Sequence, residues 1–376
     1  GDTQYELMGS ENQISPLTAE LAPTSFFPMT EDMAPDVMNN NLFFYSEKRL
    51  FIYFPTFEAT GQQAFELSRH VPDYLPEKFW TSAVSAAHNT LFAVEGPNPT
   101  NKIFCYRNQT AGDQIVQNAF YKFEIGASSK IYSIVCVGDF LYGLIGEGNS
   151  LSLQRMNLRP DDGDIPRLDD QVLGLPISIV SYDSTTNQTR VAVQNLTENP
   201  YNNWNTLVDQ LGSIYSVTKD PDQETPEGFN PSYPVWYGFI DGLLTNSLIG
   251  SMGSSFDTSI TLSDTFVRDA ENNIVTGTLN LRYGVLRHHK TGSYNVDVTR
   301  KNRATKSYQF TPELVGSLDS NTGDNFFELD GIFKFPILGF SDDIVISITS
   351  NNPNPMNITN IELSGKFKRV PHFLTT

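Results

Sequence analysis

Hydrophobic and polar residues follow a strand-type period along most of this chain. The segment LFFYSEKRLFIYF, residues 42–54, has two apolar runs around a polar Ser-Glu-Lys-Arg turn, which is the pattern of a β-hairpin. Four short apolar segments follow between residues 79 and 126, and three more between 131 and 157. Loops that contain Asn, Pro or Gly separate them. The pattern predicts antiparallel β-structure throughout this part of the chain.

The two groups of strands repeat each other at a spacing of about 50 residues. TSAVSAAHNTLFAVEG aligns with YSIVCVGDFLYGLIGEG, and KIFCYRN then aligns with LSLQRMN. Four-stranded units that repeat at this period are typical of β-propeller blades. The repeat predicts propeller blades over residues 1–157, and a β-sandwich is the alternative.

The pattern of apolar and polar residues changes after Leu158. Two acidic, Pro-containing loops, 159–170 and 218–234, flank further strands, and residues 199–213 are the best candidate for a short helix. From residue 262 to the end, alternating strands with polar turns predict an antiparallel β-sandwich. We therefore expect an all-β protein with three domains: propeller blades (1–157), an irregular β-rich region (158–261) and a C-terminal sandwich (262–376).

The charge excludes one class of function. The chain has 376 residues with 25 Lys and Arg against 43 Asp and Glu, so its formal net charge is -18. Wrapping of nucleic acid needs a cationic surface that releases counterions, so an acidic protein of this kind is not expected to do it. No apolar run is long enough for a membrane span, and the first residues do not form an export signal. Cys105 and Cys136 lie in apolar strands and are predicted to be free thiols.

The segment ELSRHVPDYLP, residues 66–76, raises the question of a hydrolytic site because it contains Ser68, His70 and Asp73. In an extended segment residues 68 and 70 share a face whereas 73 points away, and two prolines hold the chain in an irregular path. Neighbours in sequence seldom converge as nucleophile, base and orienting acid. The segment is predicted to be a packed connector, and we expect no catalytic residue here.

The other polar clusters do not form recognisable sites either. DSNTGDNFFE, residues 319–328, resembles a calcium loop, but Gly323 occupies the fifth position and not the sixth. His288 and His289 are neighbours, so on a strand they face opposite sides and cannot bind one metal ion together. The carboxylates of the 159–170 loop do not identify a glycosidase, because the separation of a catalytic pair is not visible in sequence. The prediction is therefore no metal and no cofactor.

One segment is cationic although the chain as a whole is acidic. It runs from 282 to 306, with Asp297 as its only acidic residue, and contains Arg282, Arg287, Lys290, Arg300, Lys301, Arg303 and Lys306. KTGS, residues 290–293, is predicted to be the turn of a hairpin whose two arms are both basic. A solvated surface is the commonest explanation for such a segment, and an acidic partner protein or transient contact with DNA are the alternatives. All of these cations except Arg282 are the candidate partner contacts.

The order of several segments resembles a known family. HVPDYLP, then KIFCYRN, then AFYKFEIG are similar to the central part of tail tubular protein B, the nozzle protein of short-tailed bacteriophages. GDTQYELMG is similar to the propeller strand that precedes that part, TGTLNLRYGVLRHHKTGSYNVDV resembles the family's C-terminal domain, and FKFPILG and ITNIELSGKFKRV follow in the same order. The matches cover residues 1–157 and 262–376. Family members are longer, so we expect this chain to start inside the propeller and the missing half, or another chain, to complete it.

The resemblance implies a structural virion protein without enzymatic activity, located in the phage tail and assembled in the host cytoplasm. It also implies a homo-oligomeric, usually hexameric, ring below the tail adaptor protein, a channel for genomic DNA, tail-fibre proteins docked nearby and the host envelope at the distal end. A glycan-binding or polysaccharide-degrading propeller of the virion is the alternative, with Trp80, Trp204 and Trp236 as stacking platforms if they share one cleft. A secreted adhesin domain is a third interpretation.

Overall fold

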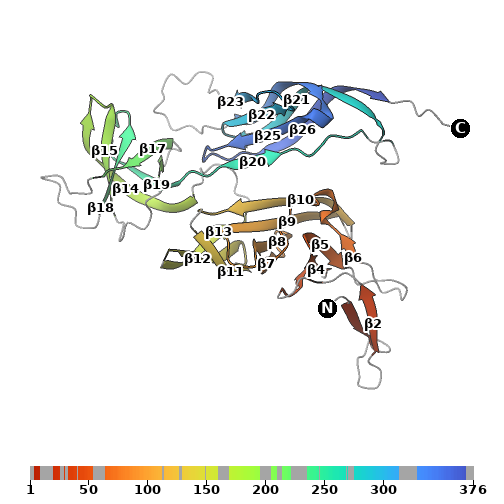
Figure 1. The fold of residues 1–376 in the computed structure, drawn as a ribbon. Coiled ribbons are helices and arrows are strands. Elements are labelled where there is room, and N and C mark those ends of the chain that lie inside the picture. Colours follow the sequence, from red (N-terminus) through yellow and green to blue (C-terminus); the bar gives the residue numbers. More distant parts are fainter. Residues whose placement is uncertain are drawn as a thin grey trace. The chain divides into compact units, whose positions relative to one another are not determined.

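The computed structural model shows an all-β chain, as predicted, with two short 3-10 turns as the only helical elements among the residues that it describes (Figure 1). It divides into two compact units, Gly1–Pro160 and Asp161–Thr376. The three-domain division at 157/158 and 261/262 stays a prediction. The described residues are 4–8, 20–25, 29, 33–39, 41–53, 64–111, 114–126, 129–148, 150–159, 169–194, 205–209, 214–221, 235–244, 246–267, 269, 275–312 and 328–369.

The first unit contains a two-stranded ribbon followed by three antiparallel sheets, and each sheet consists of consecutive strands. The ribbon pairs β1 (Gln4–Met8) with β2 (Glu20–Ser25). The first sheet comprises β3 (Asp36–Met38), β4 (Asn41–Ser46), β5 (Arg49–Tyr53) and β6 (Ala64–Glu66). The second comprises β7 (Phe79–Ser85), β8 (Thr90–Glu95), β9 (Lys102–Ala111) and β10 (Gln114–Glu124). The third comprises β11 (Ser129–Val137), β12 (Phe140–Glu147) and β13 (Ser150–Asn157).

The hairpin predicted over residues 42–54 is confirmed as β4 and β5. Glu47 and Lys48 form its tip with positive φ angles of 41° and 64°, the backbone that the tightest hairpin turns require. Leu42 to Ser46 then pair with Tyr53 to Arg49 without a register shift.

The second sheet is buried on both faces because its strands alternate two apolar sets. One cross-strand row joins Ala83, Phe92, Cys105 and Tyr121, and these residues share a core with side chains of the third sheet. The next row, offset by one residue, includes Leu91 and Tyr106 and shares a core with the first sheet. Because successive residues of a strand point to opposite faces, the two rows place the second sheet between two others.

The three sheets have the strand order of propeller blades, and the repeat of about 50 residues corresponds to equivalent strands of the second and third sheets. The first strands of successive sheets, β3, β7 and β11, adjoin each other. A closed ring of blades is not formed by the described residues, so the propeller itself stays a prediction.

The second unit begins with a closed six-stranded barrel in the order β14-β15-β18-β17-β16-β19. Its strands are β14 (Asp169–Asp183), β15 (Gln188–Gln194), β16 (Thr206–Asp209), β17 (Ile214–Lys219), β18 (Val235–Asp241) and β19 (Leu248–Ser254). Trp236 is 2% exposed and fills the barrel core. The predicted helix over 199–213 is wrong for Thr206–Asp209, because these residues pair with β17 on one side and β19 on the other. Residues 199–204 and 210–213 lie outside the described part.

Two further sheets share one core and form the C-terminal sandwich. One has the order β20-β25-β22-β23 and the other β24-β21-β26. Their strands are β20 (Thr258–Thr261), β21 (Gly277–Thr291), β22 (Tyr294–Arg300), β23 (Lys306–Phe310), β24 (Glu328–Phe340), β25 (Ile344–Ser350) and β26 (Ile358–Arg369). Neither sheet is a simple succession of neighbouring strands, in contrast to those of the first unit.

Both cysteines are free thiols, as predicted. Cys105 is 1% exposed, and burial raises its thiol pKa well above the ordinary value. Burial and the nearby carboxylate of Asp36 raise the pKa of Cys136 to about 11. Neither thiol is therefore poised as a nucleophile at neutral pH. None of the described helical segments has the length and apolar composition that a membrane crossing requires.

Candidate functional site

The Ser68, His70 and Asp73 trio does not assemble into a hydrolytic site. Ser68 lies in a 3-10 turn, Ser68–His70, so this stretch is not extended as expected. Its side chain is fully buried, and its hydroxyl oxygen accepts a hydrogen bond from the Leu50 amide at 3.0 Å. His70 and Asp73 are exposed. A buried nucleophile without access to substrate, and an exposed base and acid, cannot act together.

The same segment anchors the core of the first unit through its aromatic residue. The Tyr74 ring makes edge-to-face contacts with Phe104 and Phe120, with ring centroids 5.7 Å and 6.4 Å apart. Burial, followed by the Cys105 thiol and the Glu124 carboxylate, raises the pKa of Tyr74 to about 12. The prediction of a packed connector is confirmed.

The predicted basic hairpin around residues 290–293 is wrong. β21 and β22 flank this turn, but β21 pairs with β24 and β26, whereas β22 pairs with β23 and β25. The turn therefore joins the two sheets of the sandwich and does not fold one strand back onto the next. The local pattern of turn residues gave no information on which strands become partners.

This topology divides the candidate cations between two places. Arg287 lies on β21, exposed, and its guanidinium is 3.0 Å from the Glu362 carboxylate; Lys290 is near the end of the same strand. The other four lie on or beside the turn between β22 and β23: Arg300, Lys301, Arg303 and Lys306. We name these four the β22–β23 turn cations. Lys301, Arg303 and Lys306 are exposed, and Lys301 N–H donates to the Asp343 carbonyl, which fixes the turn.

The two neighbouring histidines face opposite sides of β21, as predicted. His288 is 2% exposed, and its Nδ1 is 3.1 Å from the Tyr294 hydroxyl, beside the Phe310 ring. His289 lies on the other side of the strand, and its Nδ1 is 2.9 Å from the carboxylate of Asp330. No group of three or more His, Cys, Asp or Glu side chains with metal-binding geometry occurs within the described ranges.

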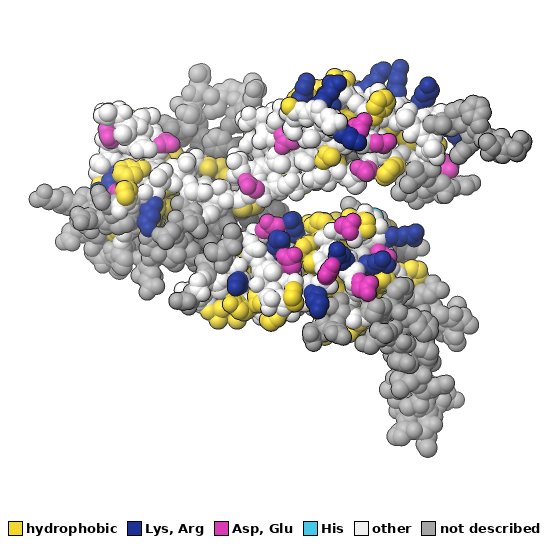
Figure 2. Space-filling view, in the orientation of Figure 1, with side chains coloured by type: hydrophobic (Ala, Val, Ile, Leu, Met, Phe, Trp, Pro, Cys, Tyr) yellow, Lys and Arg dark blue, Asp and Glu magenta, His cyan; other side chains and the backbone are white. Residues whose placement is uncertain are grey.

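Sequence reasoning missed a second set of cations on the sheet β24-β21-β26. Exposed Lys334 lies on β24, and exposed Lys366, Lys368 and Arg369 lie on β26. Figure 2 shows that Lys and Arg side chains gather over the C-terminal sandwich. Lys366 and Lys368 alternate with Gly365 and the half-buried Phe367, which is the signal that could have placed them on one outward face. The Lys334 ammonium lies 3.9 Å from the centroid of the Tyr283 ring.

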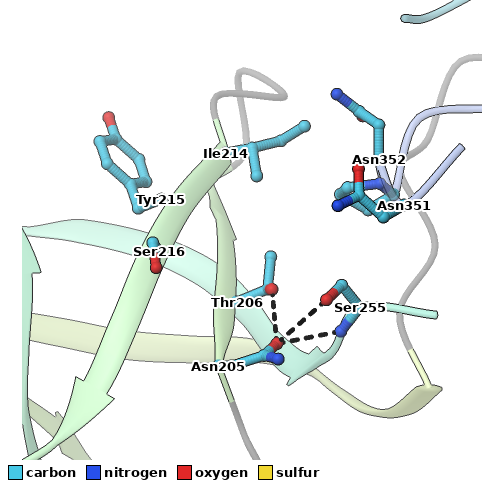
Figure 3. Close-up of a pocket in the computed structure, with 9 residues that line it drawn as sticks. Asn205, Thr206, Ile214, Tyr215, Ser216, Ser255, Asn351 and Asn352 are labelled. Carbon is cyan, nitrogen blue, oxygen red and sulfur yellow. Dashed lines mark hydrogen bonds between the residues drawn. The ribbon is translucent and has the colours of Figure 1, made fainter. Parts of the chain in front are cut away.

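A pocket of about 270 Å³ in the second unit is polar but uncharged (Figure 3). The Asn205 side-chain oxygen accepts hydrogen bonds from the Thr206 hydroxyl at 2.7 Å and from the Ser255 amide at 3.0 Å. The hydrogen bond from Ser255 to this oxygen therefore connects the start of β16 to the residues that follow β19. The described residues that line the pocket include no acid, base or cation; they are Asn205, Thr206, Ile214, Tyr215, Ser216, Ser255, Asn351, Asn352 and Pro353.

Several residues and segments that were considered as candidate sites from the sequence lie outside the described residues. They are Trp204, the stretch 319–327 of the calcium-like loop, residues 161–168 of the first acidic loop and 222–234 of the second.

The family comparison covers nearly the whole chain. The model of the family described as bacteriophage nozzle protein matches residues 1–370. No curated protein matches.

The similar solved structures include an exo-beta-1,3-galactanase from Phanerochaete chrysosporium with galactose. It is 10% identical, with a TM-score of 0.25 over 96% of this chain and 75% of that one. A variant of the same enzyme with beta-1,3-galactotriose is 9% identical, with a TM-score of 0.20 over 97% and 94% of the two chains. Likeness at this level supports neither a shared fold nor a shared activity.

Proposed function

Because the chain belongs to the bacteriophage nozzle protein family, it is a structural, non-enzymatic component of the virion tail, and we propose that its copies form a hexameric ring around a channel for genome ejection. The family match over residues 1–370 is the observation that carries this proposal. In such a ring the neighbours are the tail adaptor protein and tail-fibre proteins, and the distal end meets the host envelope.

An exposed apolar surface on the third sheet supports a role in assembly. On β11, Val135 and Val137 are 53% and 59% exposed, and on β13 Leu151 and Leu153 are 61% and 70% exposed. Monomeric soluble proteins rarely leave so much apolar side chain of one sheet in water. A protein that works inside a multi-subunit particle covers such a surface by contact with other chains.

The charge suits a channel through which DNA passes. The net charge of -18 disfavours tight binding to phosphates, so a duplex would slide without being held. The β22–β23 turn cations lie on or beside an exposed turn and are opposite in sign to this net charge. We assign them, with Arg287 and Lys290, to contact with an acidic neighbouring protein of the tail, because exposed cations act mainly in steering and orienting partners.

The glycan-binding alternative gains no support from the two tryptophans that the structure describes. Trp236 is enclosed in the barrel core and cannot stack on a sugar. Trp80 is 42% exposed, but its indole N–H donates to the Tyr132 carbonyl at 2.9 Å, so it serves to join the second and third sheets.

The proposal is tested by imaging the purified full chain, alone and with the tail adaptor protein. We expect closed sixfold rings in negative-stain or cryo-electron micrographs, and stacking of these rings on the adaptor. A chain that remains monomeric with the adaptor present, or that releases sugars from host polysaccharide in a turnover assay, would contradict the proposal.

A further inference from the structure

The sheet β24-β21-β26 has an outward face that mixes cations with exposed apolar side chains. Its inner side chains, such as Leu286 and Phe335, are buried in the sandwich core. Its outward positions include Lys334, which lies opposite Val285, and the pair formed by Phe340 and Lys366, which both lie opposite Asn280. We call this surface the outer face and define it by Ile332, Lys334, Leu338, Phe340, Lys366 and Lys368.

Its apolar side chains are unusually open to water for strand residues. Ile332 is 62% exposed, Leu338 59% and Phe340 52%. They lie at outward positions along β24, which is one of the two edge strands of its sheet. An exposed apolar edge strand favours association with another chain. The exposed Lys334 between these side chains favours a partner that carries acidic residues.

Leu338 adds a second, independent observation, because its backbone is strained. Its φ angle is +55°, in the left-handed region that glycine occupies freely and leucine enters at a cost of about 1–2 kcal/mol. It lies opposite the irregularity between Leu281 and Tyr283, where the register of β21 and β24 shifts. Most of this side chain lies in water, so the fold itself buries little of it. A contact with another chain would bury it and offset the cost of the strained backbone.

A complementary surface is present in the same sequence. Residues 161–255 contain 13 Asp and Glu against 3 Lys and Arg, whereas residues 256–376 are almost balanced, with 13 against 12. Asp183 and Asp241 are exposed acidic residues in the described part of the barrel, whereas the outer face carries the exposed cations Lys334, Lys366 and Lys368. Opposite charges on two separate surfaces favour contact between copies.

One end of the barrel presents this acidity together with an apolar side chain. Asp183 at the end of β14 and Asp241 at the end of β18 are both exposed and both lie opposite Gln188. Leu243, just beyond, is 59% exposed. A hydrogen bond from the Thr185 amide at 2.7 Å lowers the pKa of Asp183, which keeps the carboxylate charged. We call Asp183, Asp241 and Leu243 the acidic barrel end.

We propose that the outer face of one copy binds the acidic barrel end of a second copy. The two surfaces are different, so the contact is head-to-tail, and such a contact generates a ring when its rotation closes. This inference rests on the proposed ring and specifies which surfaces build it. The mixture of cations with Leu338 and Phe340 matches the mixture of carboxylates with Leu243.

The test is a charge swap in the full chain. Lys366→Glu with Lys368→Glu, or Asp183→Lys with Asp241→Lys, is expected to weaken self-association about tenfold or more, measured by mass photometry over a concentration series. The chain with all four substitutions is expected to recover most of the loss. Lys122→Glu with Lys130→Glu, on exposed lysines of the first unit, makes the same change in charge elsewhere and is expected to have no effect.

The Leu338→Gly substitution distinguishes an effect on self-association from an effect on folding. Glycine relieves the left-handed backbone, so the thermal stability of the dissociated chain should hold or rise while self-association weakens. A wild-type chain that never assembles would overturn the proposed ring. Normal assembly of every variant beside an assembling wild type would overturn this inference alone, as would a failure of the four substitutions to restore association. Loss of DNA binding with unchanged association would also overturn it and identify the outer face as a nucleic-acid surface.

Discussion

The sheets of the first unit consist of consecutive strands, whereas those of the C-terminal sandwich join strands that are far apart in the chain. Strands β7 to β10 pair each with the next, across loops of a few residues. β21, by contrast, finds its partners β24 and β26 only after some 40 to 80 further residues, as the pairs Leu286 with Phe333 and Leu286 with Ile361 show. Local pairing can form early and independently, but the sandwich needs its whole length before its core closes.

This difference predicts that core truncation in the sandwich has the largest effect on stability. Phe335 is 1% exposed, and its ring covers Gly284 of β21 so closely that an added Cβ atom would collide with the ring. Phe335→Ala should lower the free energy of unfolding of the second unit by about 3–5 kcal/mol. Hydrogen exchange would then rise across β21, β24 and β26 and stay low in β7 to β10.

Ile332→Ala, on the same strand but 62% exposed, is the matched control and should change stability by less than about 0.5 kcal/mol. Equal loss of protection in both units after Phe335→Ala would show that they unfold as one, and the contrast between local and distant pairing would have no energetic meaning.

The next effect concerns the connector of the first unit. Tyr74→Ala removes a half-buried ring from its contacts with Phe104 and Phe120 and should cost about 2–3 kcal/mol, measured by denaturant unfolding. Tyr74→Phe keeps the ring and should retain most of this stability. Assembly of the variant particle should be impaired for Ala and close to normal for Phe. The idea fails if the two substitutions behave alike.

Ser68→Ala tests the same segment at a polar atom. The substitution leaves the buried Leu50 amide without its acceptor, and this should cost about 1–2 kcal/mol. Tail function should nevertheless survive, since the serine has no catalytic role. Arg69→Ala, at the exposed neighbour, should be neutral. An Ser68→Ala chain that is fully stable but yields non-infectious particles would revive the hydrolytic interpretation.

The same contrast explains what could be predicted from the sequence. The 42–54 hairpin, the burial of Cys105 and the opposite directions of His288 and His289 all depend on period and neighbours, so alternation was sufficient. The partners of β21 and the closure of the barrel through β16 depend on strands that are distant in the chain. The alternation of apolar and polar residues does not show which distant strands pair. For this reason the 290–293 hairpin was wrong. The outer face stayed hidden because β24 and β26 contribute to it from separate segments.

The smallest effect concerns Asp36, at the start of the first sheet, and depends on pH. Burial raises the pKa of its carboxyl group, and the hydrogen bond with Ser82 offsets this only in part. The folded chain therefore holds the proton more tightly than the unfolded chain, so the side chain favours folding when protonated and opposes it as the pH rises through the carboxyl range. Asp36→Asn should raise the melting temperature of the first unit at pH 7, and the gain should disappear in acid. Asp73→Asn, at an exposed carboxylate of the same unit, should show no such difference. A lower melting temperature for Asp36→Asn at pH 7 would mean that the charged carboxylate has a favourable partner, and the first sheet would then be held by more than its apolar rows.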